Sequence, residues 1–275
     1  MAHPQIAVFA RMADQNAKPV RKIEGQKTLL GRTMHGIAYD EIHDEFSVPQ
    51  QFAQAILTFR GDASGETAPV RVIQGSKTQL EAPDRLAVDA VHNEIFVPEG
   101  KLLVYDRTAN GNVAPIRVIE GPDTRINASA VAVDPINNLV IVAGGGGFGG
   151  AGGGGGGGGG TRFLIFDRTA NGNVKPKMVI SGPRSLGGPF TVYPPKKLII
   201  ATNRPTGGEL SGPDSYLGIW SYEKDGDHPP LWRIGGPNGV LEMPRGVALD
   251  VKNKSIIMSD KRLNSVLTFS FPDMF

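Results

Sequence analysis

Four aspartates that recur at one position of an internal repeat are the residues best suited to metal chemistry. A histidine or an asparagine follows each of them by three residues. The pairs are Asp40 with His43, Asp89 with His92, Asp134 with Asn137, and Asp250 with Asn253. A group of carboxylates could bind calcium. A position repeated in every unit fits a structural role better, because Asp accepts hydrogen bonds from the turn that follows it. We expect turn caps, in which His and Asn interchange, and no metal pair.

A second candidate set lies just before the repeated segments that end in these aspartates. The residues there include His35, Arg85 and Arg245, with Arg184 in a preceding loop. Guanidinium groups bind anions, and a histidine would make such binding sensitive to pH. Alternatively, these are solvated loop charges, some of them paired with Asp84 or Glu242.

Catalytic chemistry finds little support in the sequence. The chain has no cysteine, which excludes disulfides, thiolate metal sites and cysteine nucleophiles. No carboxylate stands among the candidate positions before the repeated segments, and His228 falls in a peripheral turn beside two prolines. We expect no catalytic residue, no metal ligand and no cofactor, and regard an enzyme as the weaker hypothesis.

The elements that must position these residues are short strands in a repeated order. The segment YDRTANGNV at 105–113 recurs as FDRTANGNV at 166–174, with looser copies at 9–19, 59–69 and 222–230. Each copy precedes a strand that ends in glycine, such as VRVIQG at 70–75. Three further apolar strands complete the unit, and Gly, Asn, Asp and Pro separate them. Four strands in about 40–50 residues form one propeller blade.

The repeat resembles the NHL type, whose inner strand reads roughly Pro-x-Gly-Ile-Ala-Val-Asp. MPRGVALD at 243–250 is the cleanest copy, and FTVYP at 190–194 departs most. The resemblance covers nearly the whole chain and implies an all-β propeller of four-stranded blades in one domain, residues 1–275. In such a fold His35, Arg85, Arg184 and Arg245 would surround one mouth of the central channel and form a ligand or partner site.

The number of blades follows from a count of strands. The chain starts in mid-blade with a third and a fourth strand, continues through four full blades, and finishes with three strands. This makes 21 strands, whereas five blades need 20 and six need 24. We favour five blades, with VRKIEG at 20–25 as the fourth strand of the last blade and IAVFA at 6–10 as an extra outer strand, because an incomplete ring would leave strand edges open. Six blades with missing strands is the alternative, and a neighbouring chain or an oligomer could then donate strands.

Two insertions extend neighbouring loops on one face. Residues 144–160 are almost entirely glycine and lie within the third full blade, while residues 204–214 occupy the same place in the next blade. The glycine tract lacks the lysine and the helix of a phosphate-binding loop, and a long flexible loop adds little closure entropy. These loops would build an asymmetric rim to which a partner could bind.

The leading hypothesis is therefore a non-catalytic binding or scaffold propeller that engages a protein partner or a larger complex through its loop-bearing face. The first alternative is a metal-dependent hydrolase or lyase like the gluconolactonase-type propellers. The second is an RNA-binding NHL propeller, although a net charge of +2 makes nucleic acid an improbable partner. No segment is apolar enough to span a membrane, and the N-terminus is not an intact signal peptide. We expect a periplasmic or secreted protein whose leader was removed, with the cytoplasm as the alternative.

Overall fold

The computed structural model describes residues 4–32, 34–144, 162–181, 189–203 and 215–275. They group into two compact units, Met1–Val118 and Ile119–Phe275, which we describe separately. Most of the glycine tract, the loop at 204–214 and Arg184 lie outside the described residues. Whether the chain is one domain stays a prediction.

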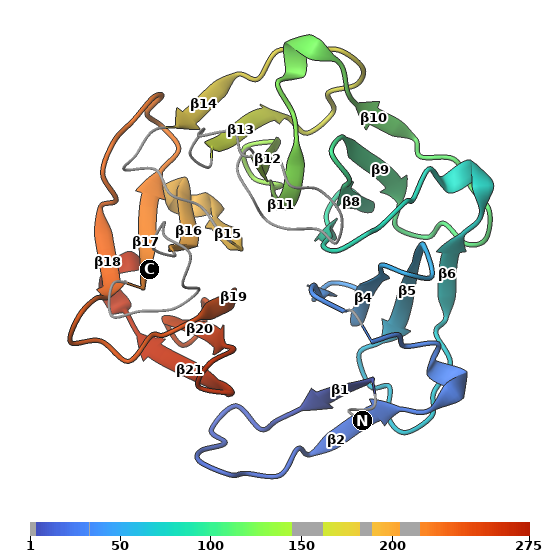
Figure 1. Ribbon diagram of the computed structural model, residues 1–275, viewed down its shortest axis with the longest axis horizontal. Helices are drawn as coiled ribbons and strands as arrows, with labels where there is room; N and C mark the ends of the chain where they lie inside the picture. The colour runs from blue at the N-terminus through green and yellow to red at the C-terminus, as the bar shows by residue number, and fades with distance from the viewer. Residues whose placement is uncertain (1–3, 33, 145–161, 182–188, 204–214) are drawn as a thin grey trace. The chain divides into compact units, whose positions relative to one another are not determined.

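The described chain is all-β and forms the antiparallel blades of a propeller, which confirms the predicted fold class (Figure 1). Its only helical pieces are five three-residue 3-10 turns, Gln26–Thr28, Ser76–Thr78, Pro122–Thr124, Pro194–Lys196 and Pro272–Met274. Five sheets begin with an inner strand and are the blades, four of them with four strands and the last with three. An additional two-stranded sheet precedes them.

The first unit contains the two-stranded sheet and two complete blades. The strands are β1 (Gln5–Val8) and β2 (Arg21–Glu24); β3 (Ala38–Asp40), β4 (Glu45–Gln50), β5 (Ala55–Arg60) and β6 (Arg71–Gln74); then β7 (Ala87–Asp89), β8 (Glu94–Pro98), β9 (Leu102–Asp106) and β10 (Arg117–Ile119).

The second unit contains two complete blades and the three-stranded one. The strands are β11 (Ala128–Asp134), β12 (Leu139–Gly144), β13 (Arg162–Asp167) and β14 (Met178–Ser181); β15 (Phe190–Tyr193), β16 (Leu198–Asn203), β17 (Tyr216–Ser221) and β18 (Trp232–Gly235); then β19 (Pro244–Asp250), β20 (Ser255–Asp260) and β21 (Ser265–Ser270).

The sheet β1–β2 is the outer half of a blade, as the mid-blade start of the sequence predicts. The amide of Val20 donates to the carbonyl of Val8 at 2.8 Å, as that of Val70 donates to the carbonyl of Thr58 in the next sheet. β1 and β2 therefore occupy the third- and fourth-strand positions. The expectation that VRKIEG completes the last blade is wrong, because β2 pairs with β1 and not with β21.

Within each unit the cores lie between successive sheets, and the middle strands are buried. Ile95, Phe96 and Val97 are consecutive residues of β8, and all three are fully buried. A sheet with one wet face would alternate apolar and polar residues, whereas a sheet packed on both sides needs a continuous apolar run. The same reasoning explains the apolar runs of β12 and β16.

The Asn-Gly turn at 110–111 joins its blade to the one before it in the first unit. Gly111 has a φ of 80°, a conformation that glycine adopts without steric cost. Its amide donates to the carbonyl of Val72 at 2.6 Å, and its carbonyl accepts from the amide of Gln74 at 3.1 Å. The side chain of Asn110 accepts from the amide of Val72 at 2.8 Å. The turn thus pairs with the outer strand of the preceding blade, which gives the repeated motif a structural role.

Candidate functional site

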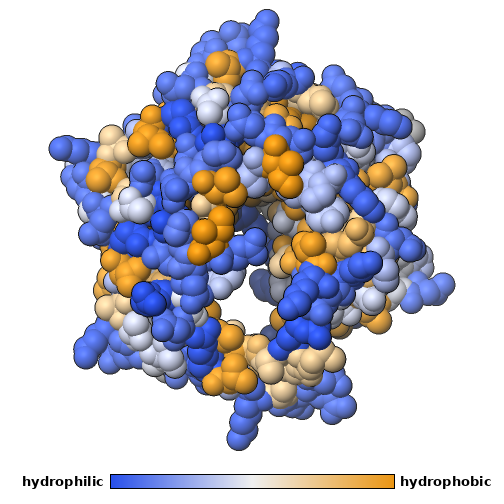
Figure 2. Space-filling view, turned by 180° about the vertical axis from the view of Figure 1, so that it is seen from behind, coloured by the Kyte–Doolittle hydropathy of each residue, from blue (hydrophilic) through white to orange (hydrophobic). Residues whose placement is uncertain are grey.

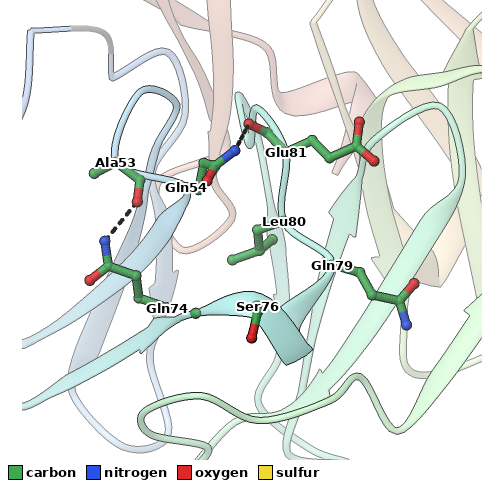
Figure 3. A pocket seen from close by; sticks show the side chains of 8 residues that line it. Ala53, Gln54, Gln74, Ser76, Gln79, Leu80 and Glu81 are labelled. Atoms are coloured by element: carbon green, nitrogen blue, oxygen red, sulfur yellow. Dashed lines mark hydrogen bonds between the residues drawn. The ribbon is translucent and has the colours of Figure 1, made fainter.

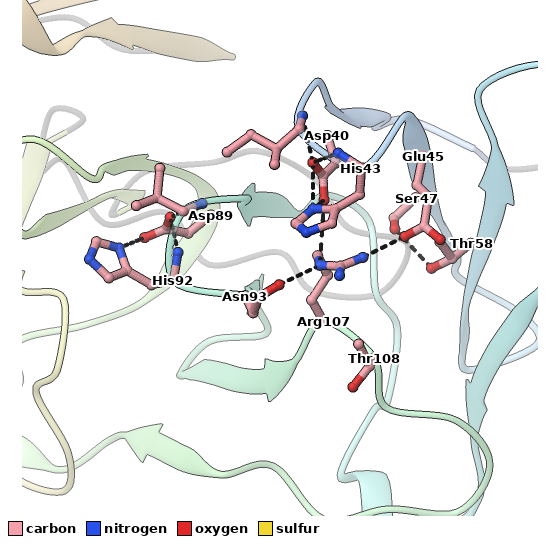
Figure 4. A network of polar contacts seen from close by, with 12 residues as sticks. Asp40, His43, Glu45, Ser47, Thr58, Asp89, His92, Asn93, Arg107 and Thr108 are labelled. Atoms are coloured by element: carbon pink, nitrogen blue, oxygen red, sulfur yellow. Dashed lines mark hydrogen bonds and ion pairs between the residues drawn. The ribbon is translucent and has the colours of Figure 1, made fainter.

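The repeated aspartates cap their own turns, as the sequence predicts (Figure 4). Asp40 Oδ1 accepts from the amides of Ile42 and His43 at 3.0 and 2.9 Å, and the ring of His43 lies 2.8 Å from Asp40 Oδ2. His92 makes the same contacts with Asp89. Asn137 and Asn253 take the place of the histidine in the second unit, where they contact Asp134 and Asp250. The carboxylates are committed to backbone donors.

An arginine of the repeated motif connects two successive blades in the first unit. Arg107 Nη1 lies 2.6 Å from Glu45 Oε2, and Arg107 Nε lies 3.5 Å from Asp40 Oδ2. Arg107 Nε also donates to Asn93 Oδ1 at 2.8 Å (Figure 4). Arg71 makes a second ion pair with Glu45. Each half-buried charge has an opposite charge beside it, which offsets the free energy of its desolvation.

In the blade β15–β18 of the second unit, a tyrosine stands at the position of Arg107, whereas the blade before it keeps an arginine there, Arg168. The amide of Tyr222 donates to the carbonyl of Lys197, as that of Arg107 donates to the carbonyl of Asn93, both at 2.9 Å. This register corrects the sequence alignment, which matched Tyr222 with the aromatic residue two positions earlier in the motif. The hydroxyl of Tyr222 donates to Asp134 Oδ2 at 2.5 Å. Burial, and then this contact, raise the pKa of Tyr222.

The predicted mouth residues of the first unit come together around one carboxylate. His35 Nδ1 contacts Asp84 Oδ1, and Arg85 Nε lies 3.6 Å from Asp84 Oδ2. The His35 side chain is 54% exposed and that of Arg85 is 18% exposed. The pairing of Arg85 with Asp84, the alternative weighed from the sequence, is therefore present. Anion binding at these residues stays a prediction.

The remaining mouth residues contribute less. Arg245 lies half-buried on β19, and its Nε has no hydrogen-bond partner within the described residues. Glu242, considered as its partner, instead pairs with Arg262 at 3.2 Å. Arg184 lies outside the described residues. Within those residues, no group of three or more histidine, aspartate or glutamate side chains is placed to hold a metal ion.

The first unit also contains a pocket that the sequence analysis missed, of about 520 Å³ (Figure 3). We call it the amide pocket, because three of its side chains are glutamines. The lining residues are Ala53, Gln54, Gln74, Gly75, Ser76, Gln79, Leu80 and Glu81. Gln54 Nε2 donates to the carbonyl of Glu81 at 3.1 Å, and Gln74 Nε2 donates to that of Ala53 at 2.7 Å. These bonds tie the β4–β5 hairpin to the end of β6 and to the segment that follows it.

An exposed aromatic residue is the sequence neighbour of a residue that lines the amide pocket. Phe52 directly precedes Ala53 at the tip of the β4–β5 hairpin and is 76% exposed. Elsewhere, apolar residues reach the surface in small groups separated by hydrophilic ones, on the face seen in Figure 2. One feature of the sequence could have indicated this site: Phe52 lies in the glutamine-rich turn at 50–54, where the strand pattern gives it no role.

Glu99 supports the segment that carries the amide pocket. Its Oε2 accepts from the amides of Glu81 and Ala82 at 2.8 and 3.1 Å. Burial raises the pKa of Glu99 in spite of these two donors. Gln50, at the same position in the previous blade, accepts from the amide of Gly31 at 2.5 Å. Glu99, which follows β8, and Gln50, which ends β4, are thus further structural acceptors.

Comparison with known proteins identifies the fold and no family. No family model matches the chain, and no curated protein does. Among solved structures 998 chains match. One of them, from the "Crystal Structure of Mitotic Checkpoint Complex", is 14% identical with a TM-score of 0.57, and the match covers 92% of this chain. This chain spans about 65% of that chain's length. Within the described residues, no helix is long and apolar enough to cross a membrane.

Proposed function

We propose that this chain is a non-catalytic scaffold propeller that binds a protein partner through its loop-bearing face. The observation that carries the proposal is the amide pocket, with the exposed Phe52 next in sequence to its lining residue Ala53. The aspartates and histidines of the repeat, which could otherwise do chemistry, form hydrogen bonds within their own turns. The structural likeness to a chain from a protein complex agrees with a scaffold role.

The chemistry of the amide pocket suits a peptide segment. A primary amide both donates and accepts hydrogen bonds, so it can pair with a peptide backbone of any sequence. Gln79 lines the pocket, and its Oε1 accepts from Lys101 Nζ at 3.1 Å, which leaves its amide nitrogen to donate. Phe52 supplies apolar area of the kind that forms hot spots in protein interfaces. A partner chain would bury Phe52 and bond to the glutamines.

The predicted mouth residues extend this proposal. His35 and Arg85 would add polar contacts on the first unit, and Arg184 and Arg245 would do so on the second. Membership of the NHL-repeat type and a periplasmic or secreted location belong to the same proposal. Fractionation of the source cells with an antibody against the chain would test the location.

A displayed library of random peptides tests the proposal directly. We expect the wild-type chain to enrich peptides whose affinity falls at least about tenfold on Phe52→Ser, equivalent to 1.4 kcal/mol. Met12→Ser is the matched control, because Met12 is also 76% exposed, and it should leave binding unchanged. Failure to enrich peptides, or equal binding to Phe52→Ser, would reject this surface. Metal analysis of the purified chain tests the first alternative: calcium or zinc bound in stoichiometric amount would instead favour the hydrolase or lyase.

A further inference from the structure

The last blade lacks the strand that completes the others. Its sheet has the order β19-β20-β21, whereas each of the four complete sheets ends with a fourth strand beside the third. Within the described residues, β21 pairs with β20 and with no other strand. One side of β21 is therefore a free strand edge. Free edges are templates for pairing with another chain.

The complete blades show which atoms of β21 would pair. In each of them the carbonyl of one third-strand residue accepts from the amide just before the fourth strand, at 2.7 or 2.8 Å. The acceptors are Thr58, Val104, Ile165 and Ile219. Thr268 holds this position in β21, because it pairs with Ile257 as Ile219 pairs with Ile200. Its backbone groups face the free edge.

A side chain beside this edge is exposed although its counterparts are buried. Val266 is 65% exposed. The residues at the same register in the complete blades are Ile56, Leu102, Phe163 and Leu217, all 0% exposed. In three of these blades the residue opposite on the fourth strand is an isoleucine, namely Ile73, Ile180 or Ile234. A fourth strand would place its isoleucine next to Val266.

Among the residues that the structure describes, no other segment supplies that strand. β2 has a fourth-strand sequence, but one of its edges pairs with β1 and the other bonds to Gly65, whose amide donates to the carbonyl of Lys22 at 2.7 Å. The residues after β21 turn away from its edge. Phe271 packs against Trp232 with ring centroids 5.8 Å apart, and Met274 is fully buried.

We propose that the free edge of β21 binds an extended segment of a partner protein by antiparallel strand addition. The segment has the pattern of this chain's own fourth strands, in which an isoleucine stands two residues before a glycine, as in VRVIQG at 70–75. Backbone hydrogen bonds supply affinity in this mode, and alternate side chains supply specificity. This site is separate from the amide pocket, so failure of one leaves the other proposal intact.

Disulfide trapping tests the register of the added strand. The chain has no cysteine, so Val266→Cys introduces a single thiol. The probe is the peptide PVRVCQG, which is the sequence of residues 69–75 with cysteine at the isoleucine position, activated as its thionitrobenzoate disulfide. Cysteines directly opposite on antiparallel strands lie at a distance that a disulfide can bridge. Release of thionitrobenzoate reports the rate.

Two controls separate strand addition from random thiol exchange. In the peptide PVRCIQG the cysteine is shifted by one residue and points to the other face of the sheet. Val251→Cys places the thiol elsewhere in the same blade, at a site that is 50% exposed in the native chain. We expect the matched pair to react at least about tenfold faster than either control, a difference of 1.4 kcal/mol in activation free energy. Equal rates would overturn the proposal.

A second measurement uses the unmodified chain. Saturating PVRVIQG peptide should slow hydrogen exchange of the β21 amides that face the free edge, including Thr268, at least about tenfold. Exchange in β13, which already has a fourth strand beside it, should not change. Unaltered exchange in β21, or protection before the peptide is added, would show that the edge is not a binding site.

Discussion

Removal of one hydroxyl group should test how the second unit joins successive blades. Tyr222→Phe deletes the donor to Asp134, a carboxylate that is 0% exposed. Asp134 retains its bonds from Asn137, so the turn cap should survive. A hydrogen bond to a charged group contributes about 1.5–3 kcal/mol. We expect the free energy of unfolding at pH 7 to fall by this amount.

The assay is urea unfolding followed by tryptophan fluorescence, because Trp220 and Trp232 lie in the same unit. Tyr193→Phe is the control, since Tyr193 is also buried and its hydroxyl makes no hydrogen bond within the described residues. This substitution should change stability by less than about 0.5 kcal/mol. A loss for Tyr222→Phe no larger than that of the control would refute the reasoning.

A double-mutant cycle isolates the charge. Asp134→Asn keeps an acceptor for Tyr222 but removes its negative charge, so Tyr222→Phe should cost less in that background. We expect a coupling energy of about 0.5–3 kcal/mol between the two positions. Additive effects would show that Tyr222 acts through packing alone.

Three further substitutions address acceptors and a turn. Asp260→Asn should lower stability by about 1–3 kcal/mol at pH 7: burial acts to raise the pKa of Asp260, but four backbone donors outweigh it and lower that pKa. The difference in unfolding free energy between wild type and variant should shrink when urea unfolding is measured below about pH 4, because the carboxylate of the wild type then protonates. Glu99→Gln should raise stability by up to about 1 kcal/mol at pH 7 and less at pH 4, since burial raises the pKa of Glu99 and disfavours its charged form; an equal effect at both pH values would contradict this. Gly111→Ala should lower stability by about 1–2 kcal/mol in thermal unfolding, because a φ of 80° strains any residue with a side chain. No atom lies within 4 Å of the added Cβ, so the loss would come from the backbone conformation and not from a clash. A neutral result would mean that the turn relaxes.

The blade elements were predictable because their signals are local. Strand limits follow from apolar runs between Gly, Pro, Asn and Asp, and each repeat confirms the others. The role of Asp40 and Asp89 was also predictable, because a turn cap needs only the following three residues. Local rules therefore sufficed for both the strands and the caps.

The contacts between blades were beyond reach of such rules. The sequence placed Arg107 next to Asp106 but gave no indication that its guanidinium binds Glu45, 62 residues away. It also misaligned Tyr222 by two positions, because aromatic residues are frequent in the motif and only the backbone register distinguishes them. Partners distant in sequence are set by packing, which no short pattern records.

Some features of the candidate sites also follow from local sequence, whereas others depend on tertiary packing. From the sequence alone came the all-β propeller, its strand order and the grouping of His35 and Arg85 before the inner strands. Only the tertiary structure placed Asp84 between those two side chains, assembled the amide pocket from two separate loops, and left β21 with a free edge. The physical reason is that repeats specify blades through local periodicity, whereas a pocket forms where separate loops meet and a free edge remains where a sheet lacks its fourth strand.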